Sequence, residues 1–428
     1  MAKEKPNMNV VFVGHVDAGK STIIGRLLFD SGIVSEQEMV KLRQEAEKHG
    51  KAGFEFAFVM DKIKEERERG VTIDLSYRKI LTQKYQVTII DAPGHRDFVK
   101  NMITGASQAD AAFLVISAVQ GVEPQTIEHL WLLRTAGVKN VAVAINKMDA
   151  VNYQEDRFNK VKEDVSKLLK SVGYNPETTV FVACSGLKGD NIVKKSENLP
   201  WYKGPTIIEQ FDQFPQPQLP TDLPLRMPVQ DVYEITGIGT VPTGKIVSGI
   251  MKVGQKVIIL PGRTGKGTEG EIKSIEMHHE SLQEASAGDN VGVNIRGIGK
   301  KDIARGDVIC DASKPAVVAE EFIATITVIN HPTVIAVGYT PIFHVHTAQV
   351  PCRIVELIEK IDPRTGEVVE KNPQFLRNGD SARVKVVPQG NLCIETMKDN
   401  PMMARFSIRD AGSTVAAGVC NEITKKKN

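Results

Sequence analysis

A glycine-rich segment near the start of the chain, residues 14–22, has the residue types that bind phosphate groups. An apolar run ends at Gly14, and the segment fits the pattern G-x-x-x-x-G-K-[ST]. The backbone N–H groups of such a loop, with the N-terminus of the following helix, point at the α- and β-phosphates of a nucleotide. Lys20 is expected to reach the β- and γ-phosphates, and the Ser21 hydroxyl to ligate Mg²⁺. The predicted contacts are Gly14, Asp17, Ala18, Gly19, Lys20, Ser21 and Thr22. The alternative is a glycine turn between a strand and a helix, which the motifs below disfavour.

Two further segments offer groups for the γ-phosphate and its metal ion. A short β-branched run at residues 87–90 ends in Asp91, and residues 91–94 fit D-x-x-G. Asp91, at the carboxyl end of a parallel strand, can hold Mg²⁺ through water, and the Gly94 N–H can donate to the γ-phosphate. Thr72 follows a charge-rich segment and can meet both the γ-phosphate and Mg²⁺ when its loop is ordered. The expected metal ligands are therefore Ser21, Thr72 and Asp91.

A motif that selects the base follows another apolar run, residues 141–145. Residues 146–149 fit N-K-x-D. The Asp149 carboxylate can accept hydrogen bonds from N1–H and the exocyclic amino group of guanine, whereas adenine has no such donor pair. Asn146 should brace the site and hydrogen-bond the base, and the stem of Lys147 should cover its face. A later apolar run is followed by Ser185, Gly186 and Leu187, where a backbone N–H is predicted to contact the guanine oxygen.

The elements that must position these residues alternate between strands and helices. Apolar runs at residues 10–13, 87–90, 111–117, 141–145 and 180–184 are separated by helix-like segments, as in repeated βαβ units. We therefore expect an α/β GTP-binding domain of the phosphate-loop type, with a mostly parallel sheet and helices on both faces. Residues 36–69 lose the apolar periodicity and are rich in charge. They fit either a solvated helix or a mobile nucleotide-sensing segment.

The character of the sequence changes after residue 214, where four prolines fall between residues 215 and 224. Beyond this stiff linker, short β-branched runs alternate with glycine turns, which predicts two all-β barrel domains. The expected domains are residues 1–220 for GTP binding, 221–315 for the middle barrel and 316–428 for the C-terminal barrel.

Composition limits the class of protein further. The chain has 428 residues with a formal net charge of +2, so binding to nucleic acid would need local basic patches. No apolar run is long enough for a transmembrane helix, and the N-terminal segment is too short and too polar for a signal peptide. We therefore expect a cytoplasmic protein without membrane contact. The five cysteines are far apart and are interpreted as reduced core residues rather than metal ligands or disulfides.

The sequence resembles a known family over nearly its whole length, from about Asn9 to Ile423. Residues 14–22, 66–74 and 91–98 look like the motifs of translational GTPases as a class. Residues 235–244 and 274–280 are more specific, because they are similar to the middle barrel of the archaeal elongation factor 1-alpha family, which is related to bacterial elongation factor Tu. Ala18 and Gly186 stand where relatives often carry another residue, but the contacts there are mainly through the backbone.

The resemblance implies a switch in which GTP closes the nucleotide domain onto the barrels and hydrolysis to GDP reopens it. Together the domains would deliver aminoacyl-tRNA to the ribosomal A site, with a guanine-nucleotide exchange factor as a further partner and a monomer as the working form. Archaeal members can also carry tRNA-mimicking release and rescue proteins. In family terms the tRNA contacts fall on Glu276, His278, Asn290, His346, Thr347, Arg409 and Thr414. Each could instead be an ordinary barrel surface or turn residue, as Asn290 in a Gly-Asp-Asn turn illustrates.

Hydrolysis of GTP needs mainly positioning and charge stabilisation. Thr72 and Gly94 would meet the γ-phosphate, and His95, directly after Gly94, is the candidate that orients the attacking water. His95 could also be a simple turn histidine. The sequence shows no arginine finger in cis, so slow intrinsic hydrolysis and strong activation by the ribosome are expected.

Two other functions remain open at this stage. A GTPase of sulfate activation shares the phosphate-loop sequence, but residues 237–244 argue against it. A ribosome-rescue or termination GTPase would carry a tRNA-mimicking protein, and such relatives usually have a long N-terminal extension, whereas about eight residues precede the first strand here.

Overall fold

The computed structural model describes residues 5–51, 53–60, 64–69, 72–262, 266–277, 280–362 and 367–427. The chain divides into two compact units, one of residues 1–134 and 138–217 and one of residues 135–137 and 218–428. The predicted divisions at residues 220 and 315 fall in connecting segments, after helix α8 (Ile207–Gln213) and before strand β17 (Val318–Val328). The three-domain boundaries themselves stay a prediction.

The first unit is built on a six-stranded sheet with the order β2-β3-β1-β4-β5-β6. The strands are β1 (Asn7–Val13), β2 (Ser76–Leu81), β3 (Gln86–Asp91), β4 (Ala111–Ser117), β5 (Asn140–Asn146) and β6 (Phe181–Ala183). Only the β2–β3 pair is antiparallel. Strand β4 is buried along its whole length, as expected for a sheet covered on both faces. The predicted, mostly parallel α/β fold is confirmed.

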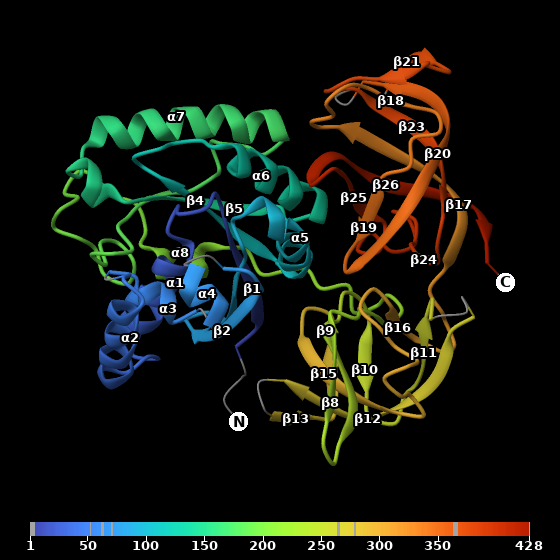
Figure 1. Ribbon diagram of the computed structural model, residues 1–428, viewed down its shortest axis with the longest axis horizontal. Helices are drawn as coiled ribbons and strands as arrows, with labels where there is room; N and C mark the ends of the chain where they lie inside the picture. The colour runs from blue at the N-terminus through green and yellow to red at the C-terminus, as the bar shows by residue number, and fades with distance from the viewer. Residues whose placement is uncertain are drawn as a thin grey trace. The chain divides into compact units, whose positions relative to one another are not determined.

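The helices cover this sheet on both sides. They are α1 (Lys20–Asp30), α2 (Glu36–Lys48), α3 (Glu55–Phe58), α4 (Lys64–Arg69), η1 (Arg96–Phe98), α5 (Val99–Gln108), α6 (Pro124–Ala136), η2 (Met148–Val151), α7 (Glu155–Val172) and α8. Helices α1 and α8 pack into one face through a core that includes Phe12, Phe113 and Phe211, while α5, α6 and α7 lie on the other face (Figure 1). Among the helices that the structure describes, none is long and apolar enough to cross a membrane.

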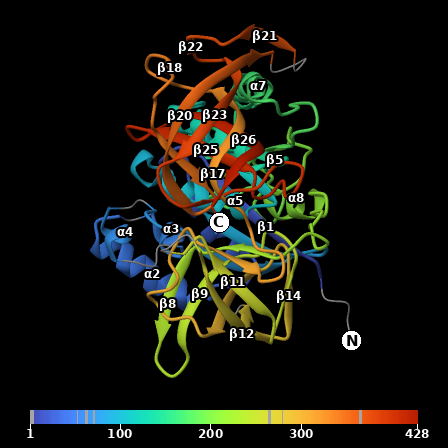
Figure 2. The same cartoon turned by 90° about the vertical axis from the view of Figure 1, so that its right-hand side faces the viewer.

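In the described parts of the charge-rich segment 36–69 the chain forms three helices rather than one solvated helix. Ser35 caps α2 through a capping box with Glu38. Helix α2 is largely exposed, whereas α3 buries Phe56 and Phe58. The three helices lie side by side (Figure 1 and Figure 2). Helix α3 packs closely on α1, because a Cβ atom at Gly25 would overlap the carbonyl oxygen of Phe56.

The described residues after 218 form strands and loops without helices, as two antiparallel β domains. The middle domain contains β7 (Arg226–Pro228), β8 (Asp231–Ile235), β9 (Gly239–Lys245), β10 (Ile250–Lys252), β11 (Lys256–Leu260), β12 (Thr268–Met277), β13 (Glu280–Leu282), β14 (Glu284–Ser286), β15 (Asn290–Arg296) and β16 (Val308–Asp311). Its main sheet has the order β7-β16-β11-β12-β15-β9-β8. Ile259, Ile272 and Val293 are among the residues of its core.

The C-terminal domain closes on itself. Its strands are β17, β18 (Ile335–Ala336), β19 (Ile342–Val345), β20 (Ala348–Ile361), β21 (Val368–Lys371), β22 (Phe375–Leu376), β23 (Ser381–Pro388), β24 (Leu392–Cys393), β25 (Arg405–Asp410) and β26 (Ser413–Lys426). Strand β19 pairs with both β25 and β20, which completes a ring with β26, β17 and β23. The predicted pair of all-β domains after the α/β domain is confirmed.

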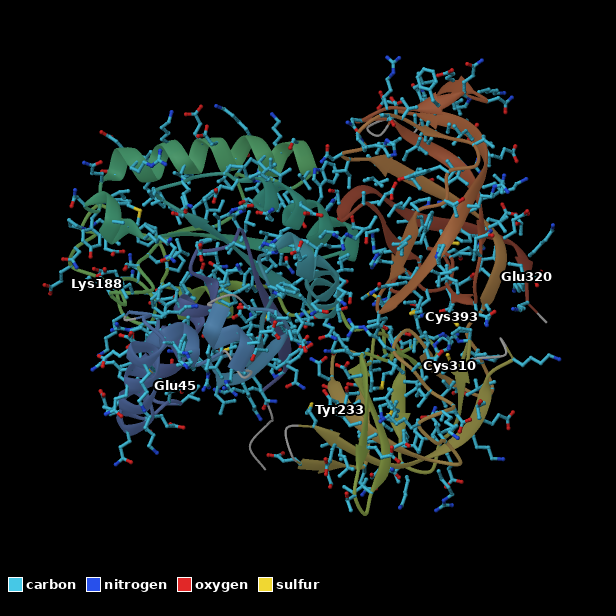
Figure 3. The ribbon with its side chains drawn as sticks, in the orientation of Figure 1. Glu45, Lys188, Tyr233, Cys310, Glu320 and Cys393 are labelled. Atoms are coloured by element: carbon cyan, nitrogen blue, oxygen red, sulfur yellow. The ribbon has the colours of Figure 1, made fainter. Side chains whose placement is uncertain are left out.

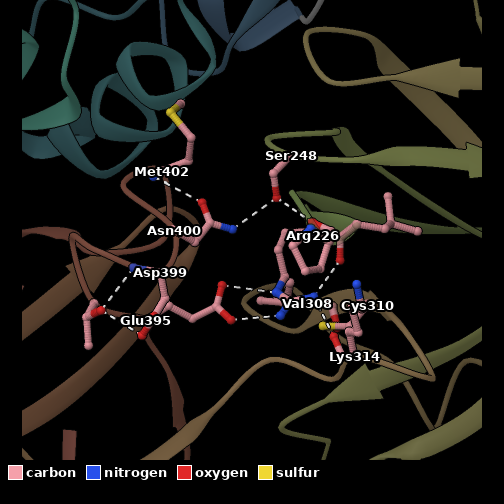
Figure 4. Close-up of polar contacts among 12 residues, drawn as sticks. Arg226, Ser248, Val308, Cys310, Lys314, Glu395, Asp399, Asn400 and Met402 are labelled. Atoms are coloured by element: carbon pink, nitrogen blue, oxygen red, sulfur yellow. Dashed lines mark hydrogen bonds and ion pairs between the residues drawn. The ribbon is translucent and has the colours of Figure 1, made fainter. Parts of the chain in front are cut away.

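The two β domains are joined by a buried polar contact. Arg226 of β7 donates to both carboxylate oxygens of Glu395, at 3.0 and 2.7 Å, and to the carbonyl of Lys314 at 2.8 Å (Figure 4). Asn400 donates to the Ser248 hydroxyl at 3.0 Å. Apolar side chains surround these contacts, and Cys310 and Cys393 lie at this junction from the two sides (Figure 3). All five cysteines are buried, as predicted for core residues, and have free thiols.

Candidate functional site

The phosphate loop connects β1 to α1 in a backbone shape that requires glycine at two positions. Gly14 has φ +146°, and a Cβ atom there would overlap the Val115 carbonyl oxygen. Gly19 has φ +91°, and its Cβ position is blocked by the side chain of Asn146. These close approaches bring β4 and β5 against the loop, so the neighbouring strands fix its curvature.

Lys20 is the buried cation of this loop. The residue is 6% exposed, and its Nζ donates to the carbonyl oxygens of Gly14 at 3.2 Å and His15 at 3.0 Å. Burial lowers the pKa of Lys20, while the carboxylates of Asp91 and Asp17 oppose that shift. Its immediate hydrogen bonds are to neutral carbonyls, so an anionic phosphate is well suited to this pocket.

Three oxygen-bearing side chains meet beside Lys20. The hydroxyls of Ser21 and Thr72 are 3.1 Å apart, although 51 positions separate the two residues in the chain. Asp91, at the end of β3, is fully buried, and within the described part of the chain neither of its carboxylate oxygens has a hydrogen-bond partner. Burial raises the pKa of Asp91 to about 6, and the nearby Ser21 hydroxyl and Lys20 ammonium counteract part of this rise. Buried oxygens of this kind fit a small, hard cation such as Mg²⁺.

A cavity of about 370 Å³ lies over the loop. It is lined by Val16, Asp17, Gly19, Lys20, Ser21, Thr22, Phe54, Ala57, Thr72, Gly94, His95 and Lys147. The cavity thus brings together predicted phosphate contacts, both predicted γ-phosphate groups and the predicted base-covering lysine. Phe54 and Ala57, beside and within α3, were not predicted, because nothing in a charge-rich segment marks which apolar residues face a ligand.

Gly94 and His95 lie at one wall of the cavity. The space for a Cβ atom on Gly94 is taken by the Lys20 Nζ, which would be 2.5 Å away. The His95 ring packs against Phe98, and its Nδ1 accepts a hydrogen bond from the Asp97 N–H at 3.2 Å. His95 is 41% exposed in its side chain, and the Asp97 carboxylate lies 3.4 Å from the same Nδ1.

The predicted base-binding residues meet at the ends of β5 and β6. Asn146 is buried and donates through Nδ2 to the Ala18 carbonyl at 2.9 Å, while its Oδ1 accepts from the Gly186 N–H at 2.9 Å. Asn146 therefore ties the phosphate loop to the segment of Ser185, Gly186 and Leu187, as its predicted bracing role requires. Its predicted hydrogen bond to the base stays a prediction.

The remaining residues of this corner have backbone features that limit substitution. Lys147 has φ +62°, and Asp149 lies two residues later in η2. A Cβ atom on Gly186 would lie 3.1 Å from the backbone nitrogen of Ile23, so larger residues would have to displace α1 slightly. Ser185 is fully buried, whereas Leu187 is exposed.

A buried histidine next to the phosphate loop was also missed by the sequence analysis. His129 of α6 is fully buried and its Nδ1 accepts a hydrogen bond from the Gly14 N–H at 3.1 Å. Burial lowers the pKa of His129 to about 3, helped by the positive charge of Lys20, so the ring is neutral at physiological pH. Its position 115 residues after Gly14 gives no local signal that the two residues meet.

The predicted tRNA-contacting residues fall in two groups within the β domains. Glu276 is exposed on β12, and Asn290 begins the neighbouring strand β15. His278 lies outside the described residues. Arg409 and Thr414 are paired across β25 and β26. His346 and Thr347 form the β19–β20 turn, where the His346 ring Nε2 lies 2.6 Å from the Met402 carbonyl and Thr347 is buried.

The fold and the cavity together define a nucleotide-binding domain of the translational GTPase class. Residues 5–222 match the elongation factor Tu GTP binding domain, residues 239–310 match elongation factor Tu domain 2, and residues 321–421 match the GTP-eEF1A C-terminal domain-like family.

Full-length relatives identify the family. The chain is 58% identical over 430 residues to elongation factor 1-alpha of Methanocaldococcus jannaschii and 56% identical over 427 residues to that of Archaeoglobus fulgidus, with 100% of each chain covered in both cases. This chain belongs to the elongation factor 1-alpha family. The fold is shared with the S. cerevisiae Ski7 GTPase-like domain, whose structure bound to GTP matches with a TM-score of 0.81 at 18% identity over 97% of both chains.

Proposed function

We propose that this chain delivers aminoacyl-tRNA to the ribosome and that it binds GTP in the cavity over residues 14–22. Hydrolysis of that GTP is the release step. GTP-dependent delivery is the function of its family, and the chain is a translational GTPase. The observation that carries the assignment of the site is that Lys20, Thr72 and Gly94 line one cavity. A γ-phosphate bound in this cavity would contact two separate segments of the chain, one at Thr72 and one at Gly94.

Mg²⁺ is the proposed companion of the nucleotide. Ser21 and Thr72 would hold it directly and Asp91 through water, a role supported by their adjacent hydroxyls and by the buried carboxylate oxygens of Asp91. When bound, the ion neutralises charge on the β- and γ-phosphates. Lys20 adds a fixed positive charge at the same phosphates, and the loop N–H groups orient them.

His95 is the proposed residue that orients the attacking water. Its place on the wall of the cavity, next to Gly94, supports this assignment. Its Nδ1 accepts a hydrogen bond from the Asp97 N–H, so the opposite edge of the ring, with Nε2, is the proposed contact to the water. Thr72 and Gly94 would hold the γ-phosphate while the ribosome completes the activation.

Guanine selection is proposed for Asp149, with Lys147 over the base and the backbone of residues 185–187 at its oxygen. The bridge that Asn146 makes between Ala18 and Gly186 supports this, because it fixes the two segments that would contact phosphate and base. The remaining predicted contacts, Gly14, Asp17, Ala18, Gly19 and Thr22, belong to the same loop.

The tRNA surface is proposed on the β domains. Glu276, His278 and Asn290 would lie near the terminal adenosine and the esterified amino acid, and His346, Thr347, Arg409 and Thr414 near the T-stem. The pairing of Arg409 with Thr414 and the adjacency of β12 and β15 support two such groupings.

Further partners are proposed from family resemblance. They are a guanine-nucleotide exchange factor and, on the tRNA surface, release or rescue proteins shaped like tRNA. The chain would act as a monomer in the cytoplasm. A sulfate-activation role is not proposed, because full-length relatives at 58% and 56% identity are elongation factors.

Filter binding of charged and uncharged tRNA tests the proposal. The protein loaded with a non-hydrolysable GTP analogue should retain charged tRNA, whereas the GDP form and uncharged tRNA should bind at least about tenfold more weakly. Equal retention in all four combinations would contradict a GTP-controlled carrier.

A further inference from the structure

The segment of Thr72 is held by Glu66, which is not among the residues that line the nucleotide cavity. The carboxylate Oε1 of Glu66, on α4, accepts hydrogen bonds from the backbone N–H groups of Ile73 at 3.0 Å and Asp74 at 3.2 Å. Glu66 is 4% exposed, so these are buried charge-assisted bonds. They fix the backbone directly after Thr72, whose hydroxyl lies 3.1 Å from that of Ser21.

The same backbone is held from the other side by α5. The side-chain amide of Asn101 is buried and donates to the carbonyl oxygen of Ile73 at 2.9 Å. Two residues later, Leu75 packs so closely on α5 that a Cβ atom on Gly105 would lie 2.8 Å from its Cδ2. Ile73 thus has its N–H bound by α4 and its carbonyl bound by α5.

Helix α5 follows Gly94 and His95 with only the short η1 between them. Residues 94–98 thus lead directly into the helix whose Asn101 contacts the Ile73 carbonyl, beside Thr72. Helix α4 is in turn tied to α2, because Arg67 donates to the Glu45 carboxylate at 2.6 Å.

We propose that Glu66 and Asn101 are positioning residues that clamp Ile73 and so place Thr72 for the γ-phosphate, which makes the Thr72 segment and α5 respond to that phosphate as one unit. This inference rests on the proposed role of Thr72. It adds that the two γ-phosphate sensors are mechanically linked through the backbone of one residue, Ile73. The clamp stabilises the GTP form selectively, because GDP offers Thr72 no γ-phosphate to meet.

Equilibrium affinities of the full chain for a non-hydrolysable GTP analogue and for GDP test the clamp. Glu66→Ala and Asn101→Ala should each weaken the analogue about tenfold while GDP affinity stays within about twofold. Glu66→Gln keeps an oxygen acceptor at the same reach and should recover most of the loss. Glu65→Ala, an exposed residue of the same helix, is the matched control and should leave the analogue-to-GDP ratio unchanged.

The Thr72→Ala variant separates the clamp from the role on which it rests. If the clamp acts through Thr72, the double variant Glu66→Ala with Thr72→Ala should lose no more than Thr72→Ala alone. A loss with Thr72→Ala but none with Glu66→Ala or Asn101→Ala would overturn the clamp and leave the proposed function intact. An equal loss of analogue and GDP affinity in Glu66→Ala would make Glu66 a structural residue. A Thr72→Ala variant with wild-type affinities would remove the proposed role of Thr72, and the clamp with it.

Discussion

At the scale of single residues, the site contains two kinds of side chain. Some line the cavity and face a ligand, and others hold the surrounding backbone in place. Lys20, Thr72 and His95 line the cavity, whereas Asn146, His129 and Glu66 make their hydrogen bonds to protein backbone. The ligand-facing groups could be predicted from sequence, because phosphate and base chemistry dictates residue type and spacing. The supporting contacts of His129 and Glu66 could not, because any buried acceptor near an N–H group would serve and only the fold brings them together.

Asp149 carries the first prediction. Its carboxylate is the proposed partner of N1–H and the amino group of guanine, so Asp149→Asn should weaken GTP binding at least about a hundredfold and favour xanthine nucleotides. Competition between GTP and XTP for the purified variant measures this shift. Wild-type GTP affinity in the variant would remove Asp149 from base selection.

His129 gives the chain a pH dependence whose sign follows from its pKa of about 3 in the folded protein. The unfolded chain, with an ordinary histidine pKa near 6.5, binds more protons between pH 3 and 6.5, so the stability contributed by neutral His129 is lost as pH falls through that window. His129→Asn keeps an acceptor for the Gly14 N–H but does not titrate. Urea unfolding at constant GDP should show the difference in unfolding free energy between the two proteins changing by about 2 kcal/mol from pH 7 to pH 5. A pH-independent difference would mean that His129 binds a proton as readily in the folded protein as in the unfolded chain.

At the scale of elements, the strands and their motifs follow from the sequence, because each motif stands at the end of a short β-branched run. The run before Asp91 became β3 and the run before Asn146 became β5. Residues 36–69 were ambiguous, since their charges hide which few apolar residues pack inward. In the structure Phe56 and Phe58 are buried and anchor α3, while a nucleotide-sensing role of this segment stays a prediction.

Because α3 packs closely on α1, adding a single methyl group at Gly25 is expected to lower the stability of the protein. A Cβ atom at Gly25 would overlap the backbone carbonyl of Phe56, which cannot rotate away, so Gly25→Ala should lower the free energy of unfolding by about 1–3 kcal/mol. Gly390→Ala is a suitable control, because its Cβ atom would sit at an ordinary 3.4 Å from Val350. Urea unfolding of both variants measures the effect. Equal stability of the two would show that α3 moves away from α1 without cost.

At the scale of the whole molecule, the two β domains are fastened together by the buried Arg226–Glu395 pair. Burial lowers the pKa of the Arg226 guanidinium, but Glu395 together with the nearby Cys310 and Cys393 raises that pKa overall, so Arg226 stays charged. Glu395→Ala would leave that charge buried without its partner, and we expect a loss of about 3–5 kcal/mol in unfolding free energy. The double variant Arg226→Met with Glu395→Leu should be close to wild type, which denaturant titration can check. An equally large loss in the double variant would mean that packing, and not the unpaired charge, sets the cost.

Single-turnover hydrolysis of GTP in the complex with charged tRNA, with and without programmed ribosomes, tests most directly whether this chain is a ribosome-activated switch. Ribosomes should accelerate hydrolysis by the wild-type protein on the order of 10³- to 10⁵-fold. His95→Ala should lose most of this acceleration while keeping its affinity for GTP, because the ring lies beside Gly94 and the proposed contacts of the base and the α- and β-phosphates belong to other residues. A wild-type rate that ribosomes do not change would contradict the switch. A variant that keeps the full acceleration would remove His95 from hydrolysis.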